Sequence, residues 1–236
     1  MPGILGLIGE TGETTELGTC LKAISHFEWN VSKEYRPARG VEFGAVYREE
    51  VMGDVDYFED PGSGFSVLLY GFALMARPSP ARLTAEGLLK SFKSEGFGVW
   101  DQLDGSFTCI IFDRRSSRLL IANDRLGTLP VYYAKNADLF AFAPEAKGIL
   151  AHSGFTPSFD EKAVASFLTA GYCLGSQSLF DGVTVMRPAS VLSLDTNSLA
   201  VQIRNYWNLK YERSSELRVM QMLRRLFTRH WWNLIV

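Results

Sequence analysis

The sequence predicts an α+β fold in which strands dominate the middle of the chain. An apolar run at residues 4–8, between two glycines, is typical of a buried strand near the start of a domain. Apolar side chains alternate along residues 107–111, a polar turn follows at 114–117, and a second apolar run follows at 119–122. That pattern indicates a β-hairpin. Helical spacing of apolar residues is confined to a few separate stretches.

Further strands are expected where short apolar runs lie between turn-forming residues. Lys135 to Asp138 is the turn of one strand pair, and Asp195 to Asn197 is the turn of another. The expected strands are residues 41–47, 65–72, 131–133, 139–142, 189–194 and 200–203.

Helices are expected over residues 83–92, 145–151 and 160–168. Either Ser158 or Asp160 supplies the N-cap of the last one, because short polar side chains accept hydrogen bonds from the first free N–H groups of a helix.

The final stretch differs from the rest of the chain. Apolar residues recur at helical spacing from Glu216 to Trp231, with four arginines between them, which predicts an amphipathic basic helix. Its apolar stripe is formed by Leu217, Met220, Leu223, Leu226, Phe227 and Trp231. The apolar residues 230–236 then predict either a covering partner or a longer natural reading frame.

Composition excludes several functional classes. The 24 basic and 26 acidic residues give a net charge of -2, so no global field attracts nucleic acid or an anionic membrane. The three cysteines show no spacing typical of a disulfide framework or a metal site. The first residues lack a basic signal region, and no apolar run approaches the ~20 residues of a membrane span. We therefore expect a soluble, cytoplasmic protein without a metal.

Several motifs follow one another along the chain. They are Leu103-Asp104-Gly105-Ser106-Phe107 with Phe112-Asp113, then the run Asn123 to Tyr133, then Phe142-Ala143-Pro144-Glu145-Ala146-Lys147, and finally the stretch from Leu168 through Arg187-Pro188-Ala189 to Trp207. With Gly3-Ile4-Leu5-Gly6 at the start, this series resembles the class II glutamine amidotransferase domain of the asparagine synthetase family over roughly residues 1–211.

The resemblance implies an Ntn-hydrolase-like four-layer αββα sandwich, in which two antiparallel sheets lie between layers of helices. It also implies that the first strand presents the N-terminal residue to a pocket. The same motifs have structural roles: we expect Asp104-Gly105 and Asn123-Asp124 to form turns. Phe107, Phe112, Tyr132 and Phe142 are expected in the core.

The nucleophile of the family is missing. In the family, the residue after the initiator methionine is a cysteine whose thiolate attacks glutamine while its own α-amino group acts as base. Here Pro2 occupies that position, and removal of the methionine would leave a secondary amine without a side-chain nucleophile. Cys109 lies in an apolar strand, while Cys20 and Cys173 lie away from any His/Asp constellation, so none is an expected replacement.

The positions expected to bind substrate have also changed. The family's NGE motif, whose asparagine and glycine form the oxyanion hole, aligns with Tyr70-Gly71-Phe72, which leaves only the Gly71 N–H as a donor. The family arginine that holds the glutamine carboxylate aligns with Val46, and Arg48 follows on the same face of the strand. The acidic residue that holds the substrate amine aligns near Thr84, with Glu86 close by. Gly71 and Arg48 are therefore the candidates for binding a glutamine-like molecule.

The family's ATP-pyrophosphatase domain, with its SGGxDS phosphate loop, has no counterpart in these residues. The expected organisation is an amidotransferase-like domain over 1–211 and a linker helix over 212–236. ATP and Mg are expected only in a synthetase module that lies in a longer chain or a separate one. The stripe of helix 216–231 is expected to dock on that module, and the alternative is that the helix packs on its own domain.

Three functions remain open. The first is a domain without glutaminase activity that serves as scaffold or partner of an ATP-dependent, amide-forming synthetase. The second is an active glutaminase of a glutamine-hydrolysing asparagine synthetase, with a pocket rebuilt around Tyr70, Phe72 and Arg48. The third is a truncated remnant without a role.

Overall fold

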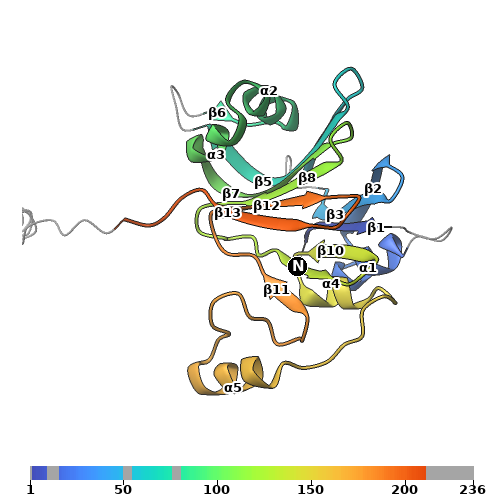
Figure 1. The fold of residues 1–236 in the computed structure, drawn as a ribbon, viewed down its shortest axis with the longest axis vertical. Coiled ribbons are helices and arrows are strands. Elements are labelled where there is room, and N and C mark those ends of the chain that lie inside the picture. Colours follow the sequence, from blue (N-terminus) through green and yellow to red (C-terminus); the bar gives the residue numbers. More distant parts are fainter. Residues whose placement is uncertain (1, 10–15, 50–54, 76–80, 211–236) are drawn as a thin grey trace, which may run out of the picture.

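The structure is a computed structural model that describes residues 2–9, 16–49, 55–75 and 81–210. Two antiparallel sheets are stacked face to face, with helices on both outer faces (Figure 1). The four-layer αββα prediction is therefore confirmed.

The first sheet has β1 at its centre. Its strands, in spatial order, are β11 (Val183–Val185), β9 (Tyr132–Lys135), β10 (Leu139–Ala143), β1 (Gly3–Gly9), β3 (Val41–Arg48) and β2 (Asn30–Ala38). Every neighbouring pair is antiparallel. β1 pairs with β3 from Gly3 and with β10 from Gly6, so β3 positions the first residues of the strand.

The second sheet contains the predicted central hairpin. Its strands, in spatial order, are β13 (Val201–Asn205), β12 (Ser190–Asp195), β8 (Arg118–Asn123), β7 (Leu103–Asp113), β5 (Phe65–Met75) and β4 (Val55–Asp60), with β6 (Ala81–Arg82) paired to β5. The hairpin is β7 and β8, whose partners run from Thr108 opposite Asn123 to Asp113 opposite Arg118.

Apolar alternation explains the stacking, since successive side chains of a strand point to opposite faces. In β1, Ile4 and Ile8 belong to the core between the sheets, whereas Leu5 and Leu7 belong to a core on the outer face. The helices α1 (Leu17–Ile24) and α4 (Ala146–Leu150) cover that outer core. The helix α2 (Ala85–Glu95), the short turn η1 (Gly96–Gly98) and α3 (Val99–Gln102) cover the outer face of the second sheet, around the buried Trp100.

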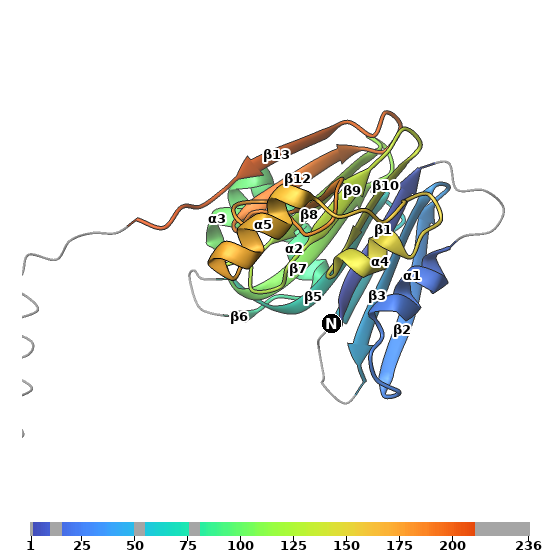
Figure 2. The same ribbon diagram turned by 90° about the horizontal axis from the view of Figure 1, so that it is seen from below.

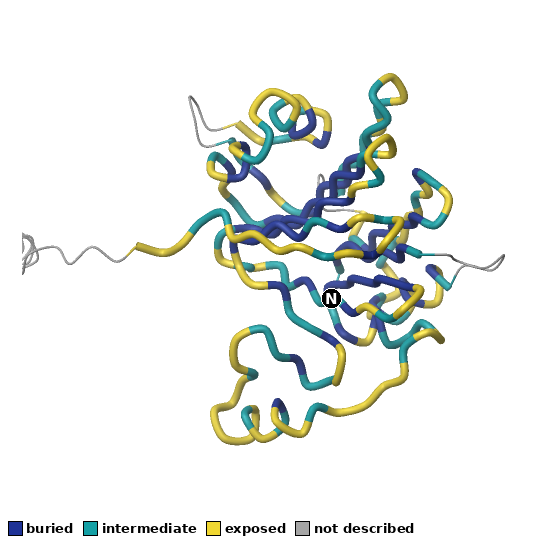
Figure 3. The backbone as a smooth tube through the Cα atoms, viewed as in Figure 1, coloured by how far each residue is buried: buried dark blue, intermediate teal, exposed yellow. Residues whose placement is uncertain are grey.

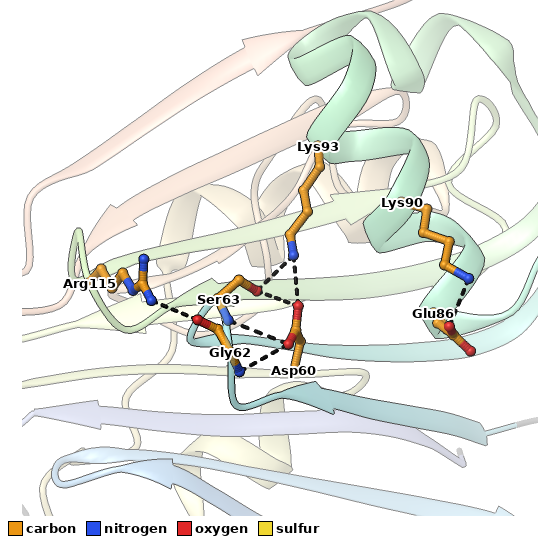
Figure 4. Close-up of polar contacts among 7 residues, drawn as sticks. All are labelled: Asp60, Gly62, Ser63, Glu86, Lys90, Lys93 and Arg115. Carbon is orange, nitrogen blue, oxygen red and sulfur yellow. Dashed lines mark hydrogen bonds and ion pairs between the residues drawn. The ribbon is translucent and has the colours of Figure 1, made fainter.

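A polar cluster joins α2 to the turn between β4 and β5 (Figure 4). Lys93 Nζ lies 2.8 Å from Asp60 Oδ2 and donates a hydrogen bond of 2.7 Å to Ser63 Oγ. Asp60 also accepts hydrogen bonds from Ser63 Oγ at 2.6 Å and from the Gly62 N–H at 3.0 Å. The helix is thus tied to the sheet by its polar side as well as by its apolar side.

The last helix, α5 (Glu161–Ala170), stands apart from both helical layers. It lies in an excursion between α4 and β11, on the near side of the molecule in Figure 2. Within the described residues, no helix is long and apolar enough to cross a membrane.

Most strands and helices match the sequence predictions, and the differences have physical causes. The second helix begins at Ala85 rather than residue 83, because Thr84 caps it by accepting a hydrogen bond from the Gly87 N–H. The turn predicted at Asp104-Gly105 is wrong: both residues lie inside β7, where the positive φ of Gly105 allows close approach to Phe72. The segment 212–236 lies outside the described residues.

Candidate functional site

The candidate site surrounds Pro2, which directly precedes β1. Two residues further along, Ile4 faces the core between the sheets. Strand alternation therefore directs Pro2 toward the same side, and Pro2 lines a small cavity there. The position matches the expectation that the first strand presents its leading residue to a pocket.

The cavity is too small for an amino-acid substrate. Its volume is ≈ 10 Å³, about the space of one water molecule, whereas pockets for small ligands typically measure ~300–1,000 Å³. None of its lining residues is charged; they are Pro2, Gly3, Ile4, Tyr70, Thr108, Leu129, Pro130, Val131 and Pro144. The space beside Pro2 is filled by rings and aliphatic side chains.

A rigid loop holds the wall formed by Leu129, Pro130 and Val131. The buried Asp124 carboxylate accepts hydrogen bonds from the N–H groups of Leu126 at 2.9 Å and Thr128 at 3.1 Å, and from Thr128 Oγ1 at 2.6 Å. The turn predicted at Asn123-Asp124 begins one residue later, because Asn123 is the last residue of β8 and the Gly127 N–H donates to the Asp124 carbonyl; this turn fixes the loop.

The backbone conformation and close packing account for a glycine at position 71 without any catalytic role. Gly71 lies in β5 opposite Phe107 with φ +93°, a conformation that other residues rarely adopt. A Cβ at this position would overlap the carbonyl oxygen of Ser106 and lie 3.0 Å from Leu129 Cδ1. Close packing against β7 and the cavity wall therefore requires glycine here, so its role as a donor to substrate stays a prediction.

Arg48 is not among the residues that line the cavity. It is the exposed last residue of β3, opposite Asn30, while Val46 is buried opposite Gly3. Val46 and Arg48 share the outer face of the sheet, whereas Pro2 faces the other side. The structure does not bring Arg48 and Gly71 together beside Pro2, and the binding role of Arg48 stays a prediction.

The position that aligns with the family's amine-binding acidic residue lies near Thr84 and Glu86, and both of these side chains have other partners. Thr84 caps α2, and the carboxylate of Glu86 pairs with Lys90 at 2.8 Å on the exposed side of that helix (Figure 4). Both lie on the outer helical layer of the second sheet.

The cysteines are poorly suited to nucleophilic attack, which requires the thiolate. Cys109 is fully buried in β7, and burial raises the pKa of its thiol. Burial also raises the pKa of Cys20, on α1, to about 12. Cys173 is half-buried in the loop after α5, and none of the three lines the cavity beside Pro2.

The structure reveals one polar constellation that sequence reasoning missed. His26 Nε2 lies 2.8 Å from Glu145 Oε1, and Lys147 Nζ lies 3.2 Å from His26 Nδ1. Loss of hydration lowers the pKa of His26. The cluster lies close to the start of β1, because Pro144 packs against Gly3, but it is outside the cavity. His26 and Glu145 are 119 residues apart, so no local spacing in the sequence predicts that they form a pair.

No group of three or more His, Cys, Asp or Glu side chains that could hold a metal ion exists among the described residues.

Comparisons with known proteins agree with this architecture. The family described as glutamine amidotransferase domain matches residues 81–207, more than half of the chain. Asparagine synthetase 3 (glutamine-hydrolyzing) of Bacillus subtilis is 31% identical over 132 residues, which are 56% of this chain and 21% of that protein. Putative asparagine synthetase 2 (glutamine-hydrolyzing) of Methanocaldococcus jannaschii is 26% identical over 126 residues, 52% of this chain and 24% of that protein. The matched region spans less than a quarter of either relative.

Solved structures share the fold. Glutamine phosphoribosylpyrophosphate amidotransferase from Bacillus subtilis, complexed with ADP and GMP, superposes with a TM-score of 0.51 at 14% identity, over 89% of this chain and 50% of that one. A structure described as the allosteric regulatory enzyme of purine biosynthesis gives a TM-score of 0.54 at 14% identity, with the same coverage. The predicted Ntn-hydrolase type of sandwich is confirmed.

Proposed function

Because the chain belongs to the glutamine amidotransferase domain family, we propose that it is an asparagine synthetase-like member that does not hydrolyse glutamine and serves as a scaffold for an amide-forming synthetase. The observation that supports this proposal is the combination of Pro2 at the head of β1 with a cavity of ≈ 10 Å³ beside it.

The chemistry of the family requires a thiolate at the position of Pro2. A thioester forms when that sulfur attacks the glutamine amide carbon and ammonia leaves. The proline ring has no group that can form this bond, and the cavity contains neither a carboxylate nor a guanidinium to hold the two charged ends of glutamine. Loss of the nucleophile and loss of the binding space both support a silent site.

The proposed partner is an ATP-dependent synthetase module, in the same chain or a separate one. Two relatives are named asparagine synthetases, and the region shared with them spans only 21% and 24% of their lengths. Under this proposal, helix 216–231 contacts the module, and ATP and Mg belong to the module rather than to this domain. The amine donor is then ammonia or a substrate amine.

The test is release of glutamate and ammonia from glutamine by the purified 236-residue chain and by its Pro2→Cys variant. The B. subtilis asparagine synthetase 3 serves as positive control for the assay. Intact mass identifies the N-terminal residue of each preparation.

We expect no turnover from either protein, because restoring the thiol does not create space for glutamine. Turnover by Pro2→Cys alone would show that the pocket opens in solution, and would contradict the inference drawn from its volume. Turnover by the unmodified chain would refute the proposed function and support the glutaminase alternative.

A further inference from the structure

The excursion around α5 has a well-defined conformation, although it stands apart from the helical layers. Asp160 caps α5 by accepting hydrogen bonds from the N–H groups of Lys162 at 2.9 Å and Ala163 at 3.1 Å. Gly171, at φ +80°, ends the helix. The Asp160 N–H also donates to the carbonyl of Leu179, which closes the base of the excursion.

This ordered excursion exposes large apolar side chains. Leu168 is 78% exposed, Phe159 68% and Tyr172 60%, while Ala163 is the buried residue of α5. Figure 3 shows the excursion mostly in the colour of exposed residues. We call Phe159, Phe167, Leu168, Tyr172 and Leu174 the α5 platform.

We expect the exposed apolar side chains of this platform to be buried by another surface. An isolated helix of about ten residues is marginal in water, and helices in proteins gain most of their stability from packing of an apolar face. A contiguous group of exposed apolar side chains commonly marks an interaction site. Five exposed apolar side chains lie within one short excursion, so we expect another segment to bury some of them.

We infer that the platform is covered by residues 216–231 of the same chain whenever no partner occupies that segment. The inference goes beyond the proposed function, since it concerns this chain alone.

Charge favours this occupant. The excursion from residue 156 to residue 182 has three carboxylates, on Asp160, Glu161 and Asp181, against the single cation of Lys162. The segment 216–231 has four arginines against the carboxylate of Glu216. Opposite charges at the rim of an apolar contact guide association and fix its register. The apolar stripe of the segment supplies the matching surface.

The position at which the described chain ends also favours residues 216–231 as the occupant. Figures 1 and 2 both show the described chain ending on the side of the molecule where α5 lies. The strand exit is fixed there, because the Arg125 guanidinium lies 5.7 Å above the ring of Trp207. From Lys210, the six residues to Glu216 reach about 20 Å when extended, and a 16-residue helix spans about 24 Å. The segment is thus tethered to the same side of the molecule as α5, which raises its effective concentration at the platform.

Cys173, within the platform loop, provides a native probe for this contact. In the full chain, Leu223→Cys places a second thiol in the centre of the apolar stripe. Gln221→Cys is the matched control, since it lies about 200° away around the same predicted helix. Cys20 and Cys109 are buried and do not compete.

Under mild oxidation, we expect Leu223→Cys to form an intramolecular disulfide with Cys173 about tenfold faster than Gln221→Cys, because the bond requires Cα atoms about 4.4–6.8 Å apart. Adding Leu168→Asp to Leu223→Cys should reduce the rate to that of the control. Circular dichroism verifies that each variant is folded, and mass spectrometry identifies the linked peptides.

Equal rates for the two variants would overturn the inference. A disulfide that forms between chains, and that depends on protein concentration, would overturn it in favour of a second copy as the occupant. Neither result depends on glutamine, so the outcome is separate from the test of the proposed function.

Discussion

The cavity beside Pro2 and the α5 platform use apolar side chains in opposite ways. Around the cavity, Tyr70, Leu129 and Pro144 leave little free space beside Pro2. On the platform, Leu168 of α5 and Tyr172 just after that helix are exposed, and α5 has defined caps at both ends. Apolar side chains leave little space beside Pro2, whereas those of the platform are available to another surface.

This contrast between the cavity and the platform agrees with the proposed scaffold role. An enzyme needs a polar, accessible pocket and tolerates a covered exterior, whereas a scaffold needs a stable interior and an exposed docking face. The small cavity beside Pro2 and the apolar platform match the second description.

The largest expected effect tests whether Gly71 is held by packing. Gly71→Ala should lower the free energy of unfolding by about 3–5 kcal/mol, because the new methyl group meets the Ser106 carbonyl oxygen at a positive φ. Gly171→Ala is the control, since Gly171 has φ +80° in the left-handed region with nothing within 4 Å, and should cost about 1 kcal/mol. Urea unfolding of both variants measures the difference. Equal losses would mean that packing does not require glycine at position 71.

A pair of leucines sharpens the contrast between interior and platform. Leu68→Ala, in the core between the sheets, should cost about 3 kcal/mol through lost burial and a cavity. Leu168→Ala on the platform should cost less than about 1 kcal/mol, even when residues 216–231 cover it, because the contact is peripheral to the core. Thermal and urea unfolding provide the two values. If Leu168→Ala lowered the free energy of unfolding as much as Leu68→Ala, the contrast between interior and platform would be contradicted.

The smallest expected effect concerns the polar cluster of Figure 4, which belongs to neither apolar region. The hydrogen bond from Lys93 holds the pKa of Asp60 well below its ordinary value near 3.8. A depressed pKa stabilises the fold above the unfolded value, and this contribution is lost as pH falls below about 4. The stability difference between the protein and Asp60→Asn should therefore be greater at pH 6 than at pH 3. A constant difference would exclude this ionic contribution.

The sequence predicted the centre of the fold better than its edges. The apolar runs of β1 and β8 and the apolar residues of β7 were recognised because both faces of these strands are largely buried. The strands β2 and β4 were not predicted, because both lie at sheet edges and contain charged side chains such as Lys33, Glu34 and Glu59.

The candidate site was only partly predictable. The prediction that the family's nucleophile is missing rests on one position, Pro2, and needs no knowledge of tertiary structure. The filling of the cavity depends on Tyr70, Leu129 and Pro144, which meet only after the two sheets stack. The pairing of His26 with Glu145 likewise depends on tertiary contact between distant segments.

The end of β13 is also a mechanical anchor. The Tyr206 hydroxyl donates a 2.6 Å hydrogen bond to the carbonyl of Asn123, and the Tyr206 N–H donates to the carbonyl of Ala189. A pulling force applied at residue 210 therefore enters β13 and is shared with β8 and β12, all in the second sheet. The strand that follows Pro2 belongs to the other sheet, so tension on the chain end reaches it only through side-chain packing.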